Sequence, residues 1–325
     1  MGDNSISIII PCFNGWKFFS KCLESLEHQA IKPEQVIIGD DCSTDGSYEK
    51  ILEYKNSSSL NLTTFQNKEN SGPGATRNAA LQYVKTEFVA FCDCDDWYET
   101  CFIAEMKKTI MNNESIDLII YDNYVVNEGV KIQENSTKMI SGYEKKELIA
   151  LYKMSLWRML VRTSIVKSVY FPPLYNGEDG AVAPQIIEKA DKIKILHKAY
   201  YNYLYRSDSV SFSTSPQVYK SLVQANDVIE KKIGNVYNHE KEFLGIKMVC
   251  YGATLNALKA RIRTREVKHF LNDFKKRYPN WIHNDYIHSL GITKIIFLRC
   301  VFRNSLLIPR IMSLSHDVVV KRRKK

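Results

Sequence analysis

Short apolar runs alternate with amphipathic stretches along the first third of the chain. Residues 5–10 form a β-branched run that stops at Pro11, as expected of a buried parallel strand. Residues 17–29 carry apolar side chains at helical spacing, and residues 35–39 form a second β-branched run. These three segments together predict a β-α-β unit.

The same alternation continues downstream. The pattern predicts further strands at 62–66, 88–92 and 117–124, and helices at 74–84 and 103–110. It favours an α/β fold with an open sheet and right-handed crossovers. A polar loop is expected at 130–141. Helical periodicity then marks 218–233 and 240–263, with breaks near 234–238 and 279–280.

Aspartates follow two of the predicted strands. Asp41 comes after the second strand, and Asp93, Asp95 and Asp96 come after strand 88–92. Ligands of open α/β sheets bind at the carboxyl ends of strands, so these acids should face one crevice. Buried carboxylates need a partner or a cation, which indicates a metal-ion platform. The alternative is a solvated acidic loop.

The two common phosphate-binding loops are missing from the sequence. No G-x-G-x-x-G follows the first strand, and no G-x-x-x-x-G-K-S/T occurs. Phosphate charge would then have to be met by a metal or by arginine.

Composition sets wide limits. A chain of 325 residues with 45% hydrophobic and 25% charged residues can bury one large or two moderate domains. Its eight cysteines show no zinc spacing, which favours reduced thiols in a cytosol. No charged and apolar leader opens the chain, so we expect a cytoplasmic protein.

Positive charge gathers at the C-terminal end. From residue 291 onward there are nine basic residues and one acid, Asp317, which gives +8 of the whole-chain net charge of +9. Bulky apolar residues lie between the charges, yet no window of about 18 residues is free of charge, which excludes a spanning helix. We expect a basic amphipathic tail, residues 291–325, on an anionic membrane surface. Nucleic acid is not expected, because the cleft is acidic and no recognition motif occurs. A helix packed on the catalytic domain is the remaining alternative.

Five motifs in order carry a family resemblance. They are residues 7–14, 39–47, 74–78, 93–97 and 177–179. Together they resemble the signature of family 2 glycosyltransferases of the bacterial surface-glycan type. The resemblance implies a GT-A fold, an open mixed sheet flanked by helices and followed by a C-terminal helical region. It places the catalytic domain at 1–213, with a nucleotide-sugar half at about 1–125 and an acceptor half at about 126–213, and the helical region at 214–325.

The resemblance also assigns the nucleotide site. Asp41 would accept a hydrogen bond from the base, commonly uracil, beside Pro11, Phe13 and Asn14. Asp95 would ligate Mn²⁺ or Mg²⁺ with Asp93 close to the ribose or the metal, as hard cations require. Arg77 would contact the nucleotide or its phosphates, unless it is an ordinary surface arginine.

Catalysis is assigned to a glycine-flanked turn that opens the apolar stretch 181–187. The resemblance makes Asp179 the general base and lets Glu178 orient the acceptor. Both acids could instead merely cap the helix. Arg206 stands where many relatives carry a histidine that serves the metal. Because arginine cannot ligate a cation, it would contact the diphosphate and leave the third metal ligand open.

Trp157 resembles an aromatic position that lines the acceptor pocket, although a core tryptophan fits equally well. The function implied is an inverting hexosyltransferase, peripheral on the inner face of the cell membrane. It would move a sugar from a nucleotide sugar, most simply a UDP-sugar, to a glycan or lipid-linked acceptor in surface polysaccharide synthesis. The alternatives are a nucleotidyltransferase acting on sugar phosphates and a catalytically silent nucleotide-sugar-binding protein.

Overall fold

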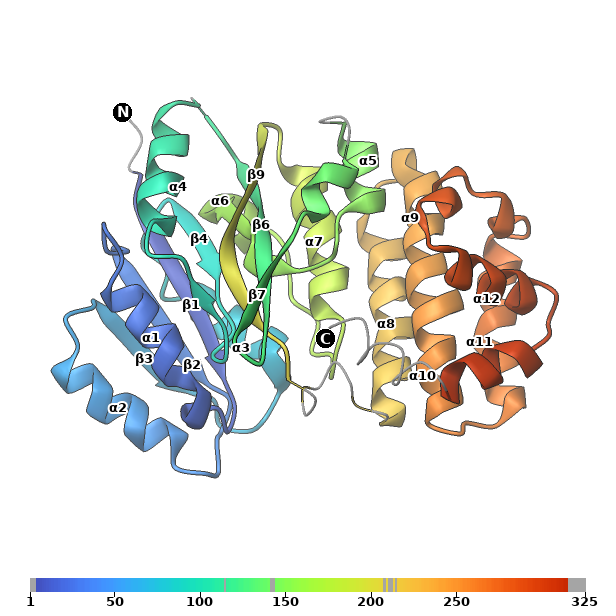
Figure 1. Ribbon diagram of the computed structural model, residues 1–325, viewed down its shortest axis with the longest axis horizontal. Coiled ribbons are helices and arrows are strands. Elements are labelled where there is room, and N and C mark those ends of the chain that lie inside the picture. The colour runs from blue at the N-terminus through green and yellow to red at the C-terminus, as the bar shows by residue number, and fades with distance from the viewer. Residues whose placement is uncertain are drawn as a thin grey trace. The chain divides into compact units, whose positions relative to one another are not determined.

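The computed structural model describes residues 4–113, 115–140, 144–206, 209, 213 and 215–314 (Figure 1). The chain divides into two compact units. The first comprises Met1–Tyr143, Lys153–Pro173 and Gln185–Tyr205, and the second comprises Glu144–Tyr152, Leu174–Pro184 and Arg206–Lys325. The boundary predicted at about residue 213 stays a prediction.

The first unit begins with the predicted β-α-β alternation. Its elements are β1 (Ile6–Cys12), η1 (Trp16–Phe18), α1 (Phe19–Glu27), β2 (Gln35–Asp40), α2 (Ser47–Ser57), β3 (Leu62–Gln66), α3 (Gly72–Leu81) and β4 (Phe88–Phe91). The strands pair in parallel in the order β3-β2-β1-β4. Strands β1, β2 and β4 are buried along their whole length, which explains their continuous apolar runs.

Antiparallel pairs complete the sheet. The further elements are β5 (Trp97–Tyr98), α4 (Phe102–Met111), β6 (Leu118–Asn127), β7 (Val130–Glu134), η2 (Ser136–Met139), η3 (Leu156–Arg158), β8 (Met159–Arg162), α6 (Thr163–Lys167) and β9 (Ile193–Leu204). In the described part of the chain the order continues β4-β8-β6-β9-β5. Strand β8 runs antiparallel to β4 and β6, whereas β9 runs parallel to β6. The predicted open mixed sheet flanked by helices is confirmed.

One prediction about this unit was wrong. Residues 130–134 are not part of a polar loop but form β7, which pairs antiparallel with β6. Glu128 and Gly129 both have positive φ, 49° and 82°, the geometry of a two-residue hairpin turn. The strand was missed because almost all of its side chains are exposed, so its short alternation of Val130 and Ile132 with polar residues buries no face.

The second unit is helical, as predicted. It contains α5 (Lys145–Leu151), the start of α7 (Glu178–Lys189), α8 (Pro216–Lys232), η5 (Asn235–Tyr237), α9 (Asn238–Gly245), the π-helix η6 (Ile246–Ala253), α10 (Thr254–Lys259), α11 (Thr264–Arg277), η7 (Trp281–His283), η8 (Asp285–Ser289) and α12 (Ile292–Phe302). The helix predicted to reach residue 263 ends at Lys259, because Arg261 takes a left-handed φ of 55°. None of the described helices combines the length and the apolar character needed to cross a bilayer.

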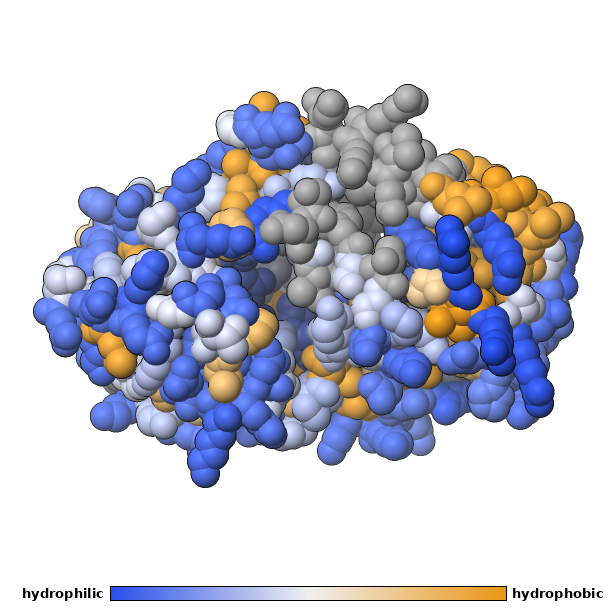
Figure 2. All heavy atoms as spheres, turned by 90° about the horizontal axis from the view of Figure 1, so that it is seen from below, coloured by the Kyte–Doolittle hydropathy of each residue, from blue (hydrophilic) through white to orange (hydrophobic). Residues whose placement is uncertain are grey.

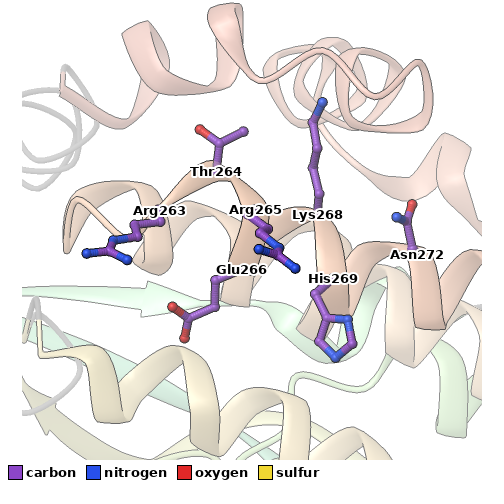
Figure 3. A pocket seen from close by; sticks show the side chains of 7 residues that line it. All are labelled: Arg263, Thr264, Arg265, Glu266, Lys268, His269 and Asn272. Atoms are coloured by element: carbon purple, nitrogen blue, oxygen red, sulfur yellow. The ribbon is translucent and has the colours of Figure 1, made fainter.

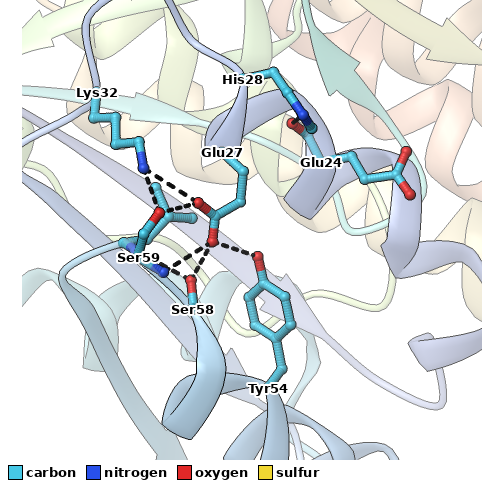
Figure 4. Close-up of polar contacts among 8 residues, drawn as sticks. Glu24, Glu27, His28, Lys32, Tyr54, Ser58 and Ser59 are labelled. Atoms are coloured by element: carbon cyan, nitrogen blue, oxygen red, sulfur yellow. Dashed lines mark hydrogen bonds and ion pairs between the residues drawn. The ribbon is translucent and has the colours of Figure 1, made fainter.

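The carboxylate of Glu27 connects helices α1 and α2 of the first unit through hydrogen bonds. Glu27 at the end of α1 accepts hydrogen bonds from Tyr54 on α2, from Ser58 and Ser59 just after α2, and from Lys32 just before β2 (Figure 4). Burial raises the pKa of Glu27, but these hydrogen bonds outweigh it and lower the pKa from 4.5 to about 2. The carboxylate therefore stabilises the fold in its charged form.

We expect Glu27→Gln to lower the free energy of unfolding at pH 7 and to flatten its pH dependence. Because the folded pKa lies below the unfolded value, the contribution is complete above pH 4.5 and is lost as the pH falls towards about 2. Urea denaturation at pH 7, 4.5 and 3 measures it. Glu24→Gln is the control, since Glu24 lies exposed one turn earlier on α1. Equal pH dependence in the two variants would contradict the assignment.

Candidate active site

Three loops meet at the carboxyl ends of β1, β2 and β4. The Asp41 N–H, just after β2, donates to the Cys12 carbonyl at the end of β1 (2.8 Å). A Cβ on Gly15 would come within 2.6 Å of the Cys94 Sγ, so the loop after β1 packs directly against the loop after β4. The predicted convergence of the strand ends on one edge of the sheet is therefore present in the first unit.

The loops after β1 and β2 are tied by Asn14. This residue has a left-handed φ of 49°, its N–H donates to Ser43 Oγ (2.8 Å), and its Oδ1 accepts from the Thr44 N–H (2.8 Å). Pro11 lies buried in β1 beside Gly39 of β2, whereas Phe13 is exposed at the rim. A planar ligand at this edge would meet the ring of Phe13.

Asp41 is held by the start of α3. Its Oδ1 accepts from Asn67 Nδ2 (2.8 Å) and the Ser71 N–H (3.1 Å), and its Oδ2 accepts from the Gly72 N–H (2.7 Å). Its side chain is only 3% exposed. The carboxylate thus fixes the helix in place, and Oδ2 keeps one lone pair for a further donor. The contact with a nucleotide base stays a prediction.

Asp40 is a buried carboxylate that the sequence analysis did not assign to the site. Its Oδ1 accepts from the Ser43 N–H (2.8 Å) and from Gln66 Nε2 (3.0 Å), while its buried Oδ2 has no hydrogen-bond partner among the described residues. Successive side chains of a strand point to opposite faces, so Asp40 and Asp41 support different sides of the sheet edge. In the sequence, the pair Asp40-Asp41 after the second predicted strand was the signal that could have identified Asp40 as part of the site.

Arg77 reaches the end of β4 from α3. Its Nη2 donates to Asp93 Oδ1 at 3.0 Å, and the residue is 3% exposed. Arg77 is therefore not a surface arginine, and that alternative is excluded. A buried guanidinium beside the aspartate cluster adds positive charge where a phosphate would need it.

Asp96 anchors the loop after β4. It is buried, and its Oδ2 accepts from the Tyr201 hydroxyl (2.8 Å) while its Oδ1 accepts from the Leu204 N–H (2.7 Å). The Tyr201 oxygen in turn accepts from the Asp93 N–H (3.1 Å). Burial, and then the charges of Asp95 and Asp93, raise the pKa of Asp96 well above its usual range. Sequence motifs point to Asp96 but not to its partners on β9.

The carboxylate oxygens of this loop are the kind of ligand that a hard cation prefers. Asp93 and Asp95 are half-buried carboxylates two residues apart, and their charges act together on Asp96. Among the described residues there is no cluster of three or more metal-binding side chains. Two carboxylates together with substrate phosphates would suit Mg²⁺ or Mn²⁺, and the metal site stays a prediction.

Trp157 belongs to a stack of aromatic rings. Its ring stacks on those of Tyr201 (centroids 4.5 Å apart) and Tyr203 (5.7 Å), and its carbonyl accepts from the Tyr121 hydroxyl (3.0 Å). It is 9% exposed, which favours the core alternative. Its predicted contact with the acceptor stays a prediction.

The remaining predicted residues belong to the second unit. Glu178 is buried and Asp179 half-buried in the first turn of α7, directly after Gly177, whose φ is 89°. Acids in a first helical turn are favoured by the helix dipole whether or not they act in catalysis. Arg206 is half-buried two residues after β9. Residues 207, 208, 210 and 211, which follow Arg206, lie outside the described residues.

Residues 7–165 match the family model described as glycosyl transferase family 2. Poly(ribitol-phosphate) beta-N-acetylglucosaminyltransferase TarS of Staphylococcus aureus is 31% identical over 204 residues, which cover 60% of this chain and 35% of TarS. UDP-Glc:alpha-D-GlcNAc-diphosphoundecaprenol beta-1,3-glucosyltransferase WfaP of Escherichia coli is 27% identical over 237 residues, or 72% of this chain and 88% of WfaP. The chain spans about a third of the longer curated relatives, 34% and 35%.

Solved structures share the fold. TarS residues 1–349 of S. aureus in complex with UDP-GlcNAc has a TM-score of 0.69 at 24% identity, covering 96% of this chain and 91% of that chain. The Pyrobaculum calidifontis mannosyltransferase PcManGT in complex with GDP-Man and Mn²⁺ has a TM-score of 0.56 at 12% identity, covering 94% and 89%.

The mixed sheet flanked by helices, followed by a helical region, is the GT-A-like fold that this chain shares with TarS. Residues 7–165, just under half of the chain, belong to glycosyl transferase family 2. The predicted family, fold class and enzyme class are thereby confirmed.

We expect Tyr201→Phe to lower the free energy of unfolding by about 1 to 3 kcal/mol, because a buried carboxylate loses a donor and the Asp93 N–H loses an acceptor. Urea denaturation measures this loss. Tyr83→Phe is the control, since Tyr83 is exposed and its hydroxyl should contribute less than about 0.5 kcal/mol. Equal losses in both variants would show that the Tyr201 hydroxyl does not support the loop.

Proposed function

We propose that the chain is an inverting glycosyltransferase that moves a sugar from a UDP-sugar to a hydroxyl of a glycan or lipid-linked acceptor in bacterial surface polysaccharide synthesis. The observation that carries the proposal is the loop after β4, where Asp93 and Asp95 lie with the buried Arg77 next to the loops after β1 and β2. Acids and a buried guanidinium close together at the carboxyl ends of parallel strands support a site for a nucleotide diphosphate.

The donor nucleotide would lie along the ends of β1 and β2. Pro11, Phe13 and Asn14 would line the base pocket, and the remaining lone pair of Asp41 Oδ2 would accept from the base. TarS, which shares the fold, is known in complex with UDP-GlcNAc. A uridine nucleotide is therefore the first donor to test.

The diphosphate would lie over the loop after β4. Asp95 and Asp93 would hold Mn²⁺ or Mg²⁺, which offsets charge on the departing diphosphate when bound. Arg77 holds Asp93 Oδ1 in place and adds a fixed positive charge beside it. Arg206 would contact the diphosphate through a charge-assisted fork.

Asp179 would act as the general base, with Glu178 orienting the acceptor. The acceptor oxygen forms a bond to the anomeric carbon while the bond from that carbon to the phosphate oxygen breaks, and the carboxylate of Asp179 takes the hydroxyl proton. Attack from the face opposite the leaving group inverts the anomeric centre.

The class of acceptor is proposed from the names of the relatives. The relatives TarS and WfaP are named for acceptors that carry phosphate, a poly(ribitol-phosphate) and a diphosphoundecaprenol-linked sugar. We place the chain on the inner face of the cell membrane, with its basic tail 291–325 towards anionic lipid. Of this tail, residues 315–325 lie outside the described residues, and α12 buries Phe297, Leu298 and Val301 within the second unit.

The two alternatives predict features that the site does not favour. A nucleotidyltransferase should have a glycine-rich phosphate loop after the first strand, whereas Phe13, Asn14 and Trp16 surround a single glycine there. A silent binding protein should have lost acids from the site, whereas Asp41, Asp93, Asp95 and Asp179 are all present.

We expect Asp179→Asn to lower kcat by about 10² to 10⁴, because the variant has no group to take the acceptor proton. UDP affinity should stay within about threefold, a change under 1 kcal/mol. Turnover with a UDP-sugar and isothermal titration with UDP measure both. Glu188→Gln, near the other end of α7, is the matched control. Full turnover in Asp179→Asn would show that Asp179 is not the general base.

We expect Asp95→Ala to abolish the Mn²⁺ dependence of UDP binding and to weaken that binding by about 10- to 100-fold, as the loss of a metal ligand does. Titration with UDP in Mn²⁺ and in EDTA measures it. Asp227→Ala, an exposed acid on α8, is the control. If the wild type bound UDP equally well with and without chelator, the metal role would be wrong.

A further inference from the structure

A hollow of about 790 Å³ lies along the first half of α11 in the second unit (Figure 3). Its lining is polar and mostly basic: Arg263, Thr264, Arg265, Glu266, Lys268, His269 and Asn272. In Figure 3, Thr264, Lys268 and Asn272 project from one side of the helix, as their spacing of four residues requires. The only acid in the lining, Glu266, already accepts a hydrogen bond from the Tyr219 hydroxyl.

The cations of this hollow have no acidic partner. Within the described residues, Arg263, Arg265 and Lys268 form no ion pair, and all three are exposed. The cations at the other end of the same helix are paired, Lys276 with Asp273 (3.2 Å) and Arg277 with Glu230 (3.4 Å). Positive charge is therefore left uncompensated on one half of α11, where an anion would be attracted.

An apolar stripe adjoins the hollow. Residues 307–314 are helical, and Leu307, Ile308, Ile311 and Leu314 are 45% to 79% exposed at positions i, i+1, i+4 and i+7. Arg310 on this segment donates from Nη2 to Thr264 Oγ1 (2.8 Å), which fixes the stripe beside the lining of the hollow. Figure 2 shows hydrophobic residues gathered on the C-terminal unit next to strongly hydrophilic ones.

The cations of the hollow and the apolar stripe together indicate which class of anionic ligand would bind. A soluble phosphodiester polymer would need the cations but not four exposed aliphatic side chains. An anionic bilayer needs both, because apolar residues enter the interface while Lys and Arg meet the head-group phosphates. The charge beyond residue 314 has the same sign, with five basic residues at 321–325 and Asp317 as the only acid.

We infer that the hollow on α11 binds the phosphate head groups of anionic phospholipids, while the stripe 307–314 enters the bilayer interface. This deepens the proposed function, on which it rests for the presence of a membrane-bound acceptor. It assigns the contact to Arg263, Arg265, Lys268 and Arg310 in addition to the extreme basic tail.

Vesicle binding by the full chain tests the head-group site. The wild type should bind phosphatidylcholine vesicles with 30% phosphatidylglycerol much more tightly than pure phosphatidylcholine vesicles, on the order of 25-fold or more. Arg265→Gln/Lys268→Gln should weaken binding to the anionic vesicles about fivefold per cation, roughly 25-fold in all. Lys231→Gln/Lys232→Gln is the matched control, with the same charge change at exposed positions of α8. Equal effects of the two pairs would overturn the site.

The stripe is tested separately. Leu307→Ser/Ile311→Ser should weaken vesicle binding at least about tenfold, because two exposed aliphatic side chains no longer leave water. The same variant should bind inorganic polyphosphate like the wild type. If vesicle binding were also unchanged in this variant, the hollow would serve a soluble polyanion and the lipid assignment would be wrong.

Catalytic assays keep the two proposals apart. All variants of the hollow and stripe should retain wild-type hydrolysis of a UDP-sugar in solution, because none of these residues belongs to the proposed active site. A wild type that hydrolyses UDP-sugar but ignores lipid charge would overturn the lipid site alone. A wild type that binds anionic vesicles but neither binds nor hydrolyses UDP-sugars would overturn the proposed function alone.

Discussion

The first unit depends on how three carboxylates are held within four residues after β4. Each is stabilised by a different means: Asp93 by the guanidinium of Arg77, Asp96 by the Tyr201 hydroxyl and the Leu204 N–H, and Asp95 by partial exposure to water. Bringing such charges together costs several kcal/mol unless partners are fixed in advance. The partners come from α3 and β9, so the arrangement of the acidic loop depends on packing between segments that are separated in sequence.

Helix α3 couples the two ends of the candidate nucleotide site. Its first residues donate to Asp41 after β2, and Arg77, about one turn later, donates to Asp93 after β4. A shift of this helix would therefore move both the base-binding and the phosphate-binding sides at once. Thr76 is fully buried between these contacts, and a Cβ on Gly39 would come within 2.6 Å of its Cγ2, so α3 lies directly on β2. Such close packing favours a rigid site, which suits a reaction that relies on placed charges.

Local pattern was enough to predict the strands that are buried on both faces and the acids that follow them. It was not enough for β7, whose short alternation of Val130 and Ile132 lies exposed, or for the partner of Arg77, which is 16 residues away. The support of Asp96 by Tyr201 spans 105 residues and depends on the pairing of β9 with β5 and β6. Such contacts are set by strand order, which a single sequence does not encode in any short motif. The position of Trp157 in a ring stack has the same origin.

In the C-terminal region, too, the sequence pattern did not predict which residues would be buried. Basic and apolar residues alternate from residue 291 onward, and the sequence cannot separate those that pack from those that face solvent. In the structure Phe297, Leu298 and Val301 of α12 are buried, whereas Leu307, Ile311 and Leu314 are exposed on the next helical segment. The packed alternative therefore holds for α12, whereas the membrane-facing role of the exposed segment that follows stays a prediction. Because packed residues fix the orientation of the exposed ones, the stripe is held beside the cations of α11, and charge and apolar surface can act on one bilayer together.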